Sequence, residues 1–413
     1  MASNSAKKNL AFDMQQRTRK ERRFAETEQK LPNYSGKVPK VTTTLAVKDK
    51  LYGILSYLGK KNPLQRPVTA QDTVWLHDNT AYRNEQTGQW EAEFVTAVFS
   101  QHPSCTVIDA VRAVASQIGL GEQDDEFNTI ETRLLPFIQD IKPGTQVRAL
   151  HNGNLPLSFA PTGSNGVSTE IKQLPAPQAS RSLAPTFAQV PDGANGLLEM
   201  RTFYAEPEGW GVISDIDDTI KITQTSDPIG ILRTTFTDHP EPCPGMPELY
   251  KHIHSLIEDP SSWFYLSASP YNLYPFLRDF RQNHYPHGTI MLRDSSWMSV
   301  QGLLTTLTVH TEDYKVGRMD NIHSWLPKRK MICVGDSTQT DPEAYGEIYR
   351  KYPGWVKIIL IRKVEDISAL GVEEKNEPER FEKAFEGVPR DAWHVFTEPE
   401  TCNEIIADLV AKP

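Results

Sequence analysis

The segment from Gly211 to Thr223, GVISDIDDTIKIT, constrains the fold of this chain more than any other stretch. An apolar run typical of a β-strand leads directly into three carboxylates, Asp215, Asp217 and Asp218. Like charges this close repel one another, so a gain in stability does not account for the cluster. One interpretation is a solvated acidic loop. The other, which the Asp-x-Asp-x-Thr order favours, is a cation-binding nucleophile loop at the carboxyl end of a parallel strand, where open α/β sheets bind ligands.

The chain from Leu197 onward alternates between strand-like and helix-like patterns. Amphipathic helical patterns such as MPELYKHIHSLIED and DPEAYGEIYRKY separate short apolar runs that are typical of buried parallel strands. These runs lie at 211–214, 263–267, 289–293, 331–334 and 356–361. The alternation predicts an α/β domain with a doubly wound parallel sheet over residues 197–413.

Several of these predicted strands end in polar side chains. The first ends in the acidic loop with Thr219, the second in Ser267, and the fourth in Asp336, followed closely by Asp341. Lys315 lies near the start of the helix before the fourth strand. Because parallel strands place their carboxyl ends on one edge, we expect these groups to converge. Carboxylates, a hydroxyl and an ammonium together suit Mg²⁺-assisted phosphoryl transfer, because Mg²⁺ prefers oxygen ligands and a carboxylate can act as nucleophile or as acid and base.

Three of these positions have alternatives in the sequence. Ser269 is a rival to Ser267 as the serine at the end of the second strand. Asp341 could simply cap the helix that begins with Pro342. Lys315 has three rivals just before the fourth strand, which we expect to be solvated: Lys328, Arg329 and Lys330.

The four polar segments together resemble the motifs of the haloacid dehalogenase superfamily. The motifs are DIDDT, the strand that ends at Ser267, Lys315, and GDSTQTD. Three longer segments resemble the fungal Mg²⁺-dependent phosphatidate phosphatases of the actin-patch-protein type: GWGVISDIDDTIKIT, YLSASPYNLYPFL and GDSTQTDPEAYGEI. The resemblance covers roughly residues 200–400.

This resemblance implies roles for the carboxylates. Asp215 would be the nucleophile that forms an aspartyl-phosphate, and Asp217 would protonate the leaving lipid alkoxide and then deprotonate the hydrolytic water. Mg²⁺ would be held by Asp215, the backbone carbonyl of Asp217, and Asp336. Asp341 would be a further ligand or lie directly behind the ligands.

The resemblance also implies which groups bind the phosphate. Ser267 and Lys315 would bind the phosphoryl oxygens, and Thr219 would brace the nucleophile loop. Asp218 occupies a more variable position of the family pattern and is assigned no step.

The chain before residue 197 is expected to form three parts. Residues 1–44 are polar and predict a disordered tail with a basic cluster, either solvated or weakly attracted to anionic lipid. Residues 45–173 predict a β-rich domain preceded by an amphipathic helix around Leu51–Leu58. Residues 174–196 are rich in Pro, Ala, Ser and Gly and predict a linker.

Within the β-rich region, alternating patterns predict short strands, among them TVWLHD, EAEFVTAVFS and IETRLLPFI. The segment TVIDAVRAVASQIGL predicts a helix. No constellation in this region suggests catalysis. We expect His77, Asp78 and His151, which stand isolated in the sequence, to lie at the surface.

Composition narrows the class of protein. A net charge of −9 argues against a general nucleic-acid binder, which needs a surplus of Lys and Arg. The four cysteines form no C-x-x-C pair, which favours a reducing compartment over a disulfide framework or a zinc site. No apolar stretch approaches the ~20 residues of a membrane span. We therefore expect a cytoplasmic protein whose membrane contact is peripheral.

The segments between the motifs are too short for a separate cap domain over the site. An open site suits a bulky substrate such as a lipid headgroup in a bilayer. Apolar residues of the two inter-motif segments either form a rim that enters the membrane interface or pack on the core. They are Ile229, Ile231, Leu232 and Phe236, and Trp297, Met298, Leu303 and Leu304.

The resemblance therefore implies a peripheral phosphatidate phosphatase that releases diacylglycerol and phosphate. One alternative is a phosphatase acting on proteins or polynucleotide ends. A second is a catalytically silent scaffold that binds protein partners through its N-terminal region.

Overall fold

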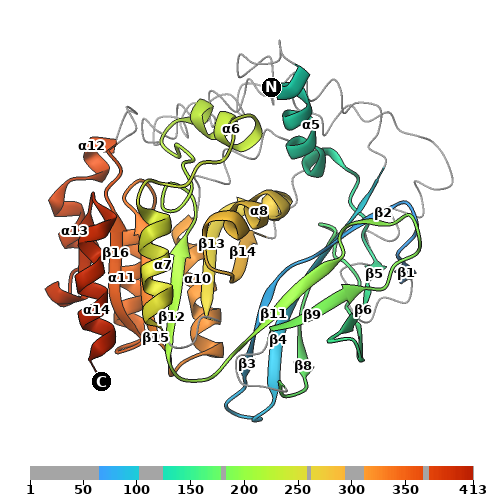
Figure 1. The fold of residues 1–413 in the computed structure, drawn as a ribbon, viewed down its shortest axis with the longest axis horizontal. Coiled ribbons are helices and arrows are strands. Elements are labelled where there is room, and N and C mark those ends of the chain that lie inside the picture. The colour runs from blue at the N-terminus through green and yellow to red at the C-terminus, as the bar shows by residue number, and fades with distance from the viewer. Residues whose placement is uncertain are drawn as a thin grey trace, which may run out of the picture.

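The computed structural model describes residues 65–101, 124–177, 183–257, 262–293, 311–365 and 372–412. Figure 1 shows two sheets side by side, with helix α8 (Tyr274–His284) between them. The predicted basic tail, the helix around Leu51–Leu58 and the helix TVIDAVRAVASQIGL lie outside the described residues. Among the helices that are described, none combines the length and the apolar character needed to cross a membrane.

The C-terminal sheet is the predicted α/β sheet, and all its described strand pairings are parallel. Its six strands lie in the order β14-β13-β12-β15-β16-β17. Their bounds are β12 Trp210–Asp215, β13 Trp263–Pro270, β14 Thr289–Arg293, β15 Lys330–Asp336, β16 Val356–Arg362 and β17 Trp393–Phe396. The chain runs outward from β12 to β13 and β14 and then crosses back to β15. The edge between β12 and β15 is therefore the topological switch point, where such sheets bind ligands.

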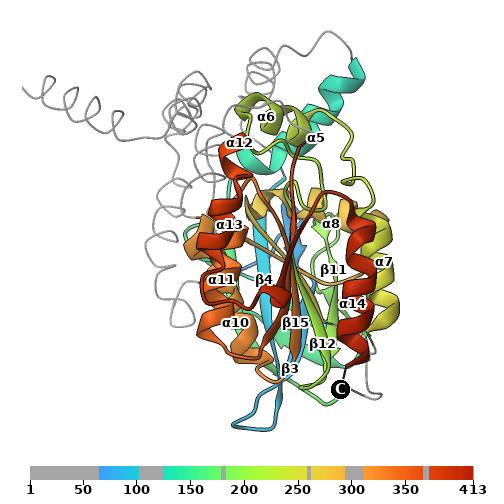
Figure 2. The same cartoon turned by 90° about the vertical axis from the view of Figure 1, so that its left-hand side faces the viewer.

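The strands alternate their side chains between two apolar cores, as the period of two requires. Val212 packs in the core beneath α7 (Met246–Leu256) and α14 (Cys402–Ala411). Ile213, the next residue, packs in the core beneath α10 (Thr311–Trp325) and α11 (Asp341–Lys351). Figure 2 shows α7 and α14 on one side of this sheet and α10, α11 and α13 on the other. This covering of both faces confirms the predicted fold class.

Shorter elements complete this domain. They are α6 Pro228–Phe236, η2 Tyr271–Leu273, α12 Val372–Lys375, α13 Pro378–Ala384, η4 Arg390–Ala392 and η5 Pro399–Thr401.

The N-terminal part is a mixed sheet of nine strands, which confirms the predicted β-rich domain. Eight strands follow the order β10-β2-β4-β3-β11-β9-β6-β7, and β8 pairs with β4. Their bounds are β2 Asp72–Leu76, β3 Asn79–Arg83, β4 Trp90–Ser100, β6 Arg148–His151, β7 Leu155–Ser158, β8 Val167–Leu174, β9 Leu183–Ala188, β10 Asn195–Leu197 and β11 Glu199–Ala205. A separate pair joins β1 (Arg66–Pro67) to β5 (Thr145–Gln146).

Two local predictions in this region are wrong. Residues 174–196, expected to be a linker, contain β9 and the start of β10, and β11 beyond them also belongs to the N-terminal sheet. The segment IETRLLPFI forms the end of helix α5 (Asp124–Ile138) and not a strand. Its fully buried residues Ile130, Leu134 and Phe137 recur at intervals of four and three, which is the period of a helix.

The turn between β2 and β3 joins the two sheets. Asp78, expected at the surface, is buried and accepts hydrogen bonds from Arg278 Nε and Nη2 and from Arg281 Nη2, each at 3.1 Å. Its backbone N–H donates to Tyr274 Oη at 2.6 Å. The buried ring of His77 stacks on Tyr274 at 3.6 Å, and burial, together with nearby Arg278, lowers the pKa of His77 to about 3. His151 is also buried rather than exposed.

Replacing Asp78 with alanine is expected to destabilise the protein. Arg278 and Arg281 would lose their shared carboxylate in a buried environment, which typically costs about 3–5 kcal/mol in the free energy of unfolding. Urea denaturation followed by circular dichroism measures this. The matched control is Glu85→Ala, which removes the surface partner of Lys328 and should barely move the midpoint. Equal midpoints for the two variants would contradict the assigned role of Asp78.

Candidate active site

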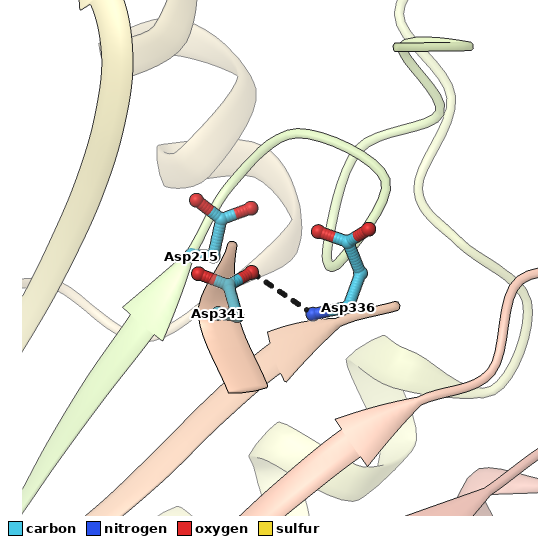
Figure 3. Close-up of side chains that lie close together, drawn as sticks. All are labelled: Asp215, Asp336 and Asp341. Carbon is cyan, nitrogen blue, oxygen red and sulfur yellow. Dashed lines mark hydrogen bonds between the residues drawn. The ribbon is translucent and has the colours of Figure 1, made fainter. Parts of the chain in front are cut away.

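Three carboxylates meet at the switch point of the parallel sheet. Asp215 is the last residue of β12, Asp336 is the last residue of β15, and Asp341 is the first residue of α11. All three side chains are fully buried, and one oxygen from each lies within 4.8 Å of the others. Figure 3 shows the three carboxylates gathered beyond the strand ends, with Asp341 Oδ2 accepting the Asp336 N–H at 3.1 Å. The predicted convergence of the first and fourth motifs is therefore present.

Lys315 reaches this cluster from α10. Its Nζ lies 2.7 Å from Asp215 Oδ1 and donates a hydrogen bond to Asp341 Oδ1. Burial by itself lowers the pKa of Lys315, but Asp215, Asp341 and Asp336 outweigh that effect and raise it above its ordinary value. The lysine is therefore charged, and it neutralises one of the three carboxylates.

The remaining negative charge is not neutralised by Lys315. Burial, followed by the nearby charge of Asp341, raises the pKa of Asp215 well above its ordinary value. The same two causes raise the pKa of Asp336 to about 7. Carboxylate oxygens this close are suitable ligands for a hard divalent cation such as Mg²⁺. The set Asp215, Asp336 and Asp341 therefore fits the metal that the sequence predicts.

Asp217 lies in the same loop but its side chain has different partners. Its Oδ2 accepts hydrogen bonds from Ser267 Oγ at 2.6 Å and Ser269 Oγ at 3.4 Å, and its Oδ1 accepts from Thr223 Oγ1 at 2.9 Å. Gln339 Nε2 donates to the Asp217 backbone carbonyl at 3.3 Å. The structure thus brings Asp217 together with both candidate serines, and Ser267 makes the shorter contact.

Thr219 lies between the first and fourth motifs. Its Oγ1 is 3.3 Å from Asp215 Oδ2 and 3.5 Å from Asp336 Oδ2, so the hydroxyl contacts both strand ends. Gly335, near the end of β15, allows the Asp341 side chain to approach the backbone closely. A Cβ at Gly335 would lie 2.6 Å from Asp341 Cβ, a distance that real Cβ atoms do not adopt.

The structure also answers the alternatives for Asp341 and Lys315. Thr340, not Asp341, is the residue at the N-cap of α11, and the Asp341 carboxylate bonds to Lys315 and the Asp336 N–H. Lys328 pairs with Glu85 at the surface. Arg329 is buried, contrary to expectation, and donates to the carbonyls of Glu206 and Trp210.

Most apolar residues of the first inter-motif segment do not form the rim that was one of the two alternatives. Ile231, Leu232 and Phe236 are fully buried in the core. The Phe236 ring meets Phe137 of α5 at 5.5 Å, and only Ile229 of the four is exposed. The other predicted rim residues, Trp297, Met298, Leu303 and Leu304, lie outside the described residues.

Sequence reasoning missed the contacts of Asp218 and of two threonines. Asp218 has a φ of 60°, a left-handed conformation that aspartate tolerates better than most residues. Its Oδ1 accepts the N–H groups of Thr223 and Gln224 at 2.8 and 2.7 Å, and its Oδ2 accepts the Thr225 N–H at 2.6 Å. Thr225 in turn contacts Thr338, which bonds to Asp336. The sequence signal was an acidic residue followed by a Thr-rich segment, TIKITQTS.

The segment that contains the site is similar to known proteins. Residues 210–363 match the family model described as "Phosphatidate phosphatase APP1, catalytic domain". The "Phosphatidate phosphatase APP1" of Saccharomyces cerevisiae is 33% identical over 162 residues, which is 38% of this chain. The match covers only 27% of that relative's length.

Two solved structures of a GH2 β-galacturonidase from Eisenbergiella tayi also align with the chain. The glycerol complex has 10% identity and a TM-score of 0.25, and the alignment covers 79% of this chain and 56% of that chain. The galacturonate complex has 11% identity and a TM-score of 0.26, over 78% and 55% of the two chains. These scores are too low to support a common fold. The family model gives the more specific similarity: residues 210–363 are similar to the phosphatidate phosphatase APP1 catalytic domain.

Proposed function

We propose that this protein is a Mg²⁺-dependent phosphatidate phosphatase that hydrolyses phosphatidate to diacylglycerol and phosphate. The observation that carries the proposal is the buried cluster of Asp215, Asp336 and Asp341 with Lys315, inside the segment that matches the family. Asp215, the Asp217 backbone carbonyl and Asp336 would hold Mg²⁺, with Asp341 as a further ligand or directly behind them. When bound, Mg²⁺ would supply charge neutralisation for the phosphoryl oxygens.

The chain's own residues divide the reaction into two steps. In the first, an Asp215 carboxylate oxygen attacks phosphorus, the bond from phosphorus to the lipid oxygen breaks, and Asp217 gives its proton to the departing alkoxide. In the second, Asp217 takes a proton from water, the water oxygen attacks phosphorus, and the Asp215 carboxylate is regenerated as phosphate leaves.

The observed contacts support separate roles for Asp215 and Asp217. Asp215 and Asp217 face different partners, so one carboxylate can attack while the other transfers a proton. Lys315 would bind a phosphoryl oxygen beside Asp215. Ser267 now donates its hydroxyl hydrogen to Asp217 and would donate to a phosphoryl oxygen when substrate is bound. Thr219 would keep the nucleophile loop against β15.

The proposed substrate is a bilayer lipid, so the reaction would take place at a membrane surface. The protein would be cytoplasmic and would associate with that membrane peripherally. The membrane-facing groups would not include Ile231, Leu232 or Phe236, because these side chains are in the core.

Phosphate release from phosphatidate in detergent micelles with Mg²⁺ tests the proposal. Hydrolysis of p-nitrophenyl phosphate without hydrolysis of phosphatidate would favour a protein or polynucleotide phosphatase, and no Mg²⁺-dependent hydrolysis of any monoester would favour a silent scaffold.

Asp217→Asn is expected to lower kcat on phosphatidate by about 10²–10⁴, because the alkoxide then leaves without a proton. In single turnovers, the loss should be smaller with p-nitrophenyl phosphate, since nitrophenolate leaves without protonation. Asp279→Asn, an exposed aspartate on α8, is the matched control and should keep full activity. Equal losses of Asp217→Asn on both substrates would contradict the acid role of Asp217.

Mg²⁺ affinity is expected to depend on pH. The pKa of Asp336 is raised to about 7, so this carboxyl holds a proton below that value and is ionised above it. Because a metal binds the ionised form, the affinity should fall about tenfold from about pH 8 to about pH 6. Isothermal titration calorimetry at the two pH values measures this. Equal affinity at both would show that no ligand titrates in this range.

The metal-free protein should show the opposite dependence in its stability. The folded pKa of Asp336 lies above the ~3.9 of an exposed aspartate, so the folded state retains a proton that the unfolded state releases. Stability should therefore decline as the pH rises from about 4 through about 7, and Mg²⁺ should reverse the loss at higher pH. Thermal melts with Mg²⁺ and with a chelator check this. A chelated protein that gains stability over this pH range would contradict it.

A further inference from the structure

A buried line of oxygen atoms connects the loop after β12 to the loop after β15. It runs from Asp218 Oδ2 to Thr225 Oγ1 at 2.7 Å, to Thr338 Oγ1 at a further 2.8 Å, and then to Asp336 Oδ1, which accepts the Thr338 hydroxyl. Each threonine has one hydroxyl hydrogen, so the Thr225 hydrogen is shared between Asp218 and Thr338. All four residues are at most 4% exposed. We call this line the threonine relay. It joins a carboxylate without an assigned step to a carboxylate of the candidate metal cluster.

The Asp218 end of the relay is fixed by backbone groups. Its two oxygens accept three backbone N–H groups from the turn at 223–225. Its backbone carbonyl accepts a hydrogen bond from Arg362 Nη1, at the end of β16, at 2.9 Å. Several bonds therefore hold Asp218 in place, whereas an isolated exposed carboxylate would rotate. A residue held in this way can serve as an anchor for the side chains that bond to it.

The Asp336 end of the relay is the end that meets the metal cluster. Asp336 Oδ1 accepts both the backbone N–H of Thr338, at 2.6 Å, and the Thr338 hydroxyl. The other oxygen, Oδ2, faces Thr219 at 3.5 Å. Two bonds to one oxygen restrict rotation of the carboxylate while the second oxygen faces the loop that carries Thr219. Groups behind a metal ligand that orient it in this way commonly contribute to metal affinity.

We propose that Asp218, Thr225 and Thr338 are positioning residues that hold the Asp336 carboxylate in the orientation required of a metal ligand. The inference rests on the proposed function for the identity of the metal as Mg²⁺. The relay orients one metal ligand, at the end of β15, from an anchor in the loop that carries the nucleophile.

Mg²⁺ binding measured by isothermal titration calorimetry, at fixed pH and ionic strength, tests the relay without substrate. Thr338→Val keeps the shape and removes the hydroxyl that bonds to Asp336, so Kd should rise about tenfold. Thr225→Val should also weaken binding. The double variant should be no weaker than Thr338→Val alone, because the two hydroxyls act in one line. Thr225→Ser keeps the hydroxyl and should restore the Kd of the unaltered protein.

A second buried threonine pair serves as the matched control. Thr80 Oγ1 and Thr289 Oγ1 lie 2.7 Å apart and join β3 to the start of β14, at the opposite edge of the sheet from the site. Thr289→Val removes a buried hydroxyl of the same kind and should leave the Mg²⁺ Kd unchanged, even where the melting temperature falls. An equal loss of affinity in this control would mean that the effect is general destabilisation and would overturn the proposal.

Two further outcomes separate the relay from the proposed function. If the unaltered protein binds Mg²⁺ and Thr225→Val binds it equally well, the relay is wrong and the proposed function stands. The same conclusion follows if the effects of the two valine substitutions multiply in the double variant. If the unaltered protein does not bind Mg²⁺ at millimolar concentration, the proposed metal is wrong and the relay falls with it.

Discussion

The chemistry of the site depends on one constraint: the parallel sheet places carboxylates that repel one another at the same edge. Asp215 and Asp336 end neighbouring strands, so the pairing of β12 with β15 brings them to one edge whatever their charge. Asp341 adds a third negative group, and Lys315 neutralises one of the three. Burial prevents water from screening the rest, which raises the pKa of Asp215 and Asp336. A bound cation would offset the excess negative charge that the protein alone leaves at this site.

The N-terminal sheet contributes to the same structure. Its Trp75 and Phe99 belong to the core that also contains Val212 and Ile332 of the C-terminal parallel sheet. The buried contacts of Asp78 with Arg278 and Arg281 fix it to α8, the helix that follows the Ser267 strand. The two sheets therefore share apolar core and buried charge, and the N-terminal sheet supports the elements that position the site.

The strand ends and their side chains could be predicted from the sequence because short apolar runs, separated by amphipathic helices, specify a parallel sheet with one carboxyl edge. Asp215, Asp336, Asp341 and Lys315 meet there as predicted. The helix that contains Ile130 was missed because a short apolar run fits the period of a strand as well as that of a helix. Asp78 was missed because its partners, Arg278 and Arg281, lie about 200 residues away. The linker prediction for residues 174–196 failed because β9 pairs with β11 despite the Pro-rich composition of this segment.

The nucleophile assignment is the central claim, and covalent trapping tests it most directly. Turnover of phosphatidate would be quenched in acid, the acyl phosphate reduced with borohydride, and the protein digested for mass spectrometry. An aspartyl-phosphate at Asp215 would be converted to homoserine at that position alone, and only when Mg²⁺ and substrate are both present. Homoserine at Asp217 or Asp336, or hydrolysis without any modified aspartate, would contradict the account.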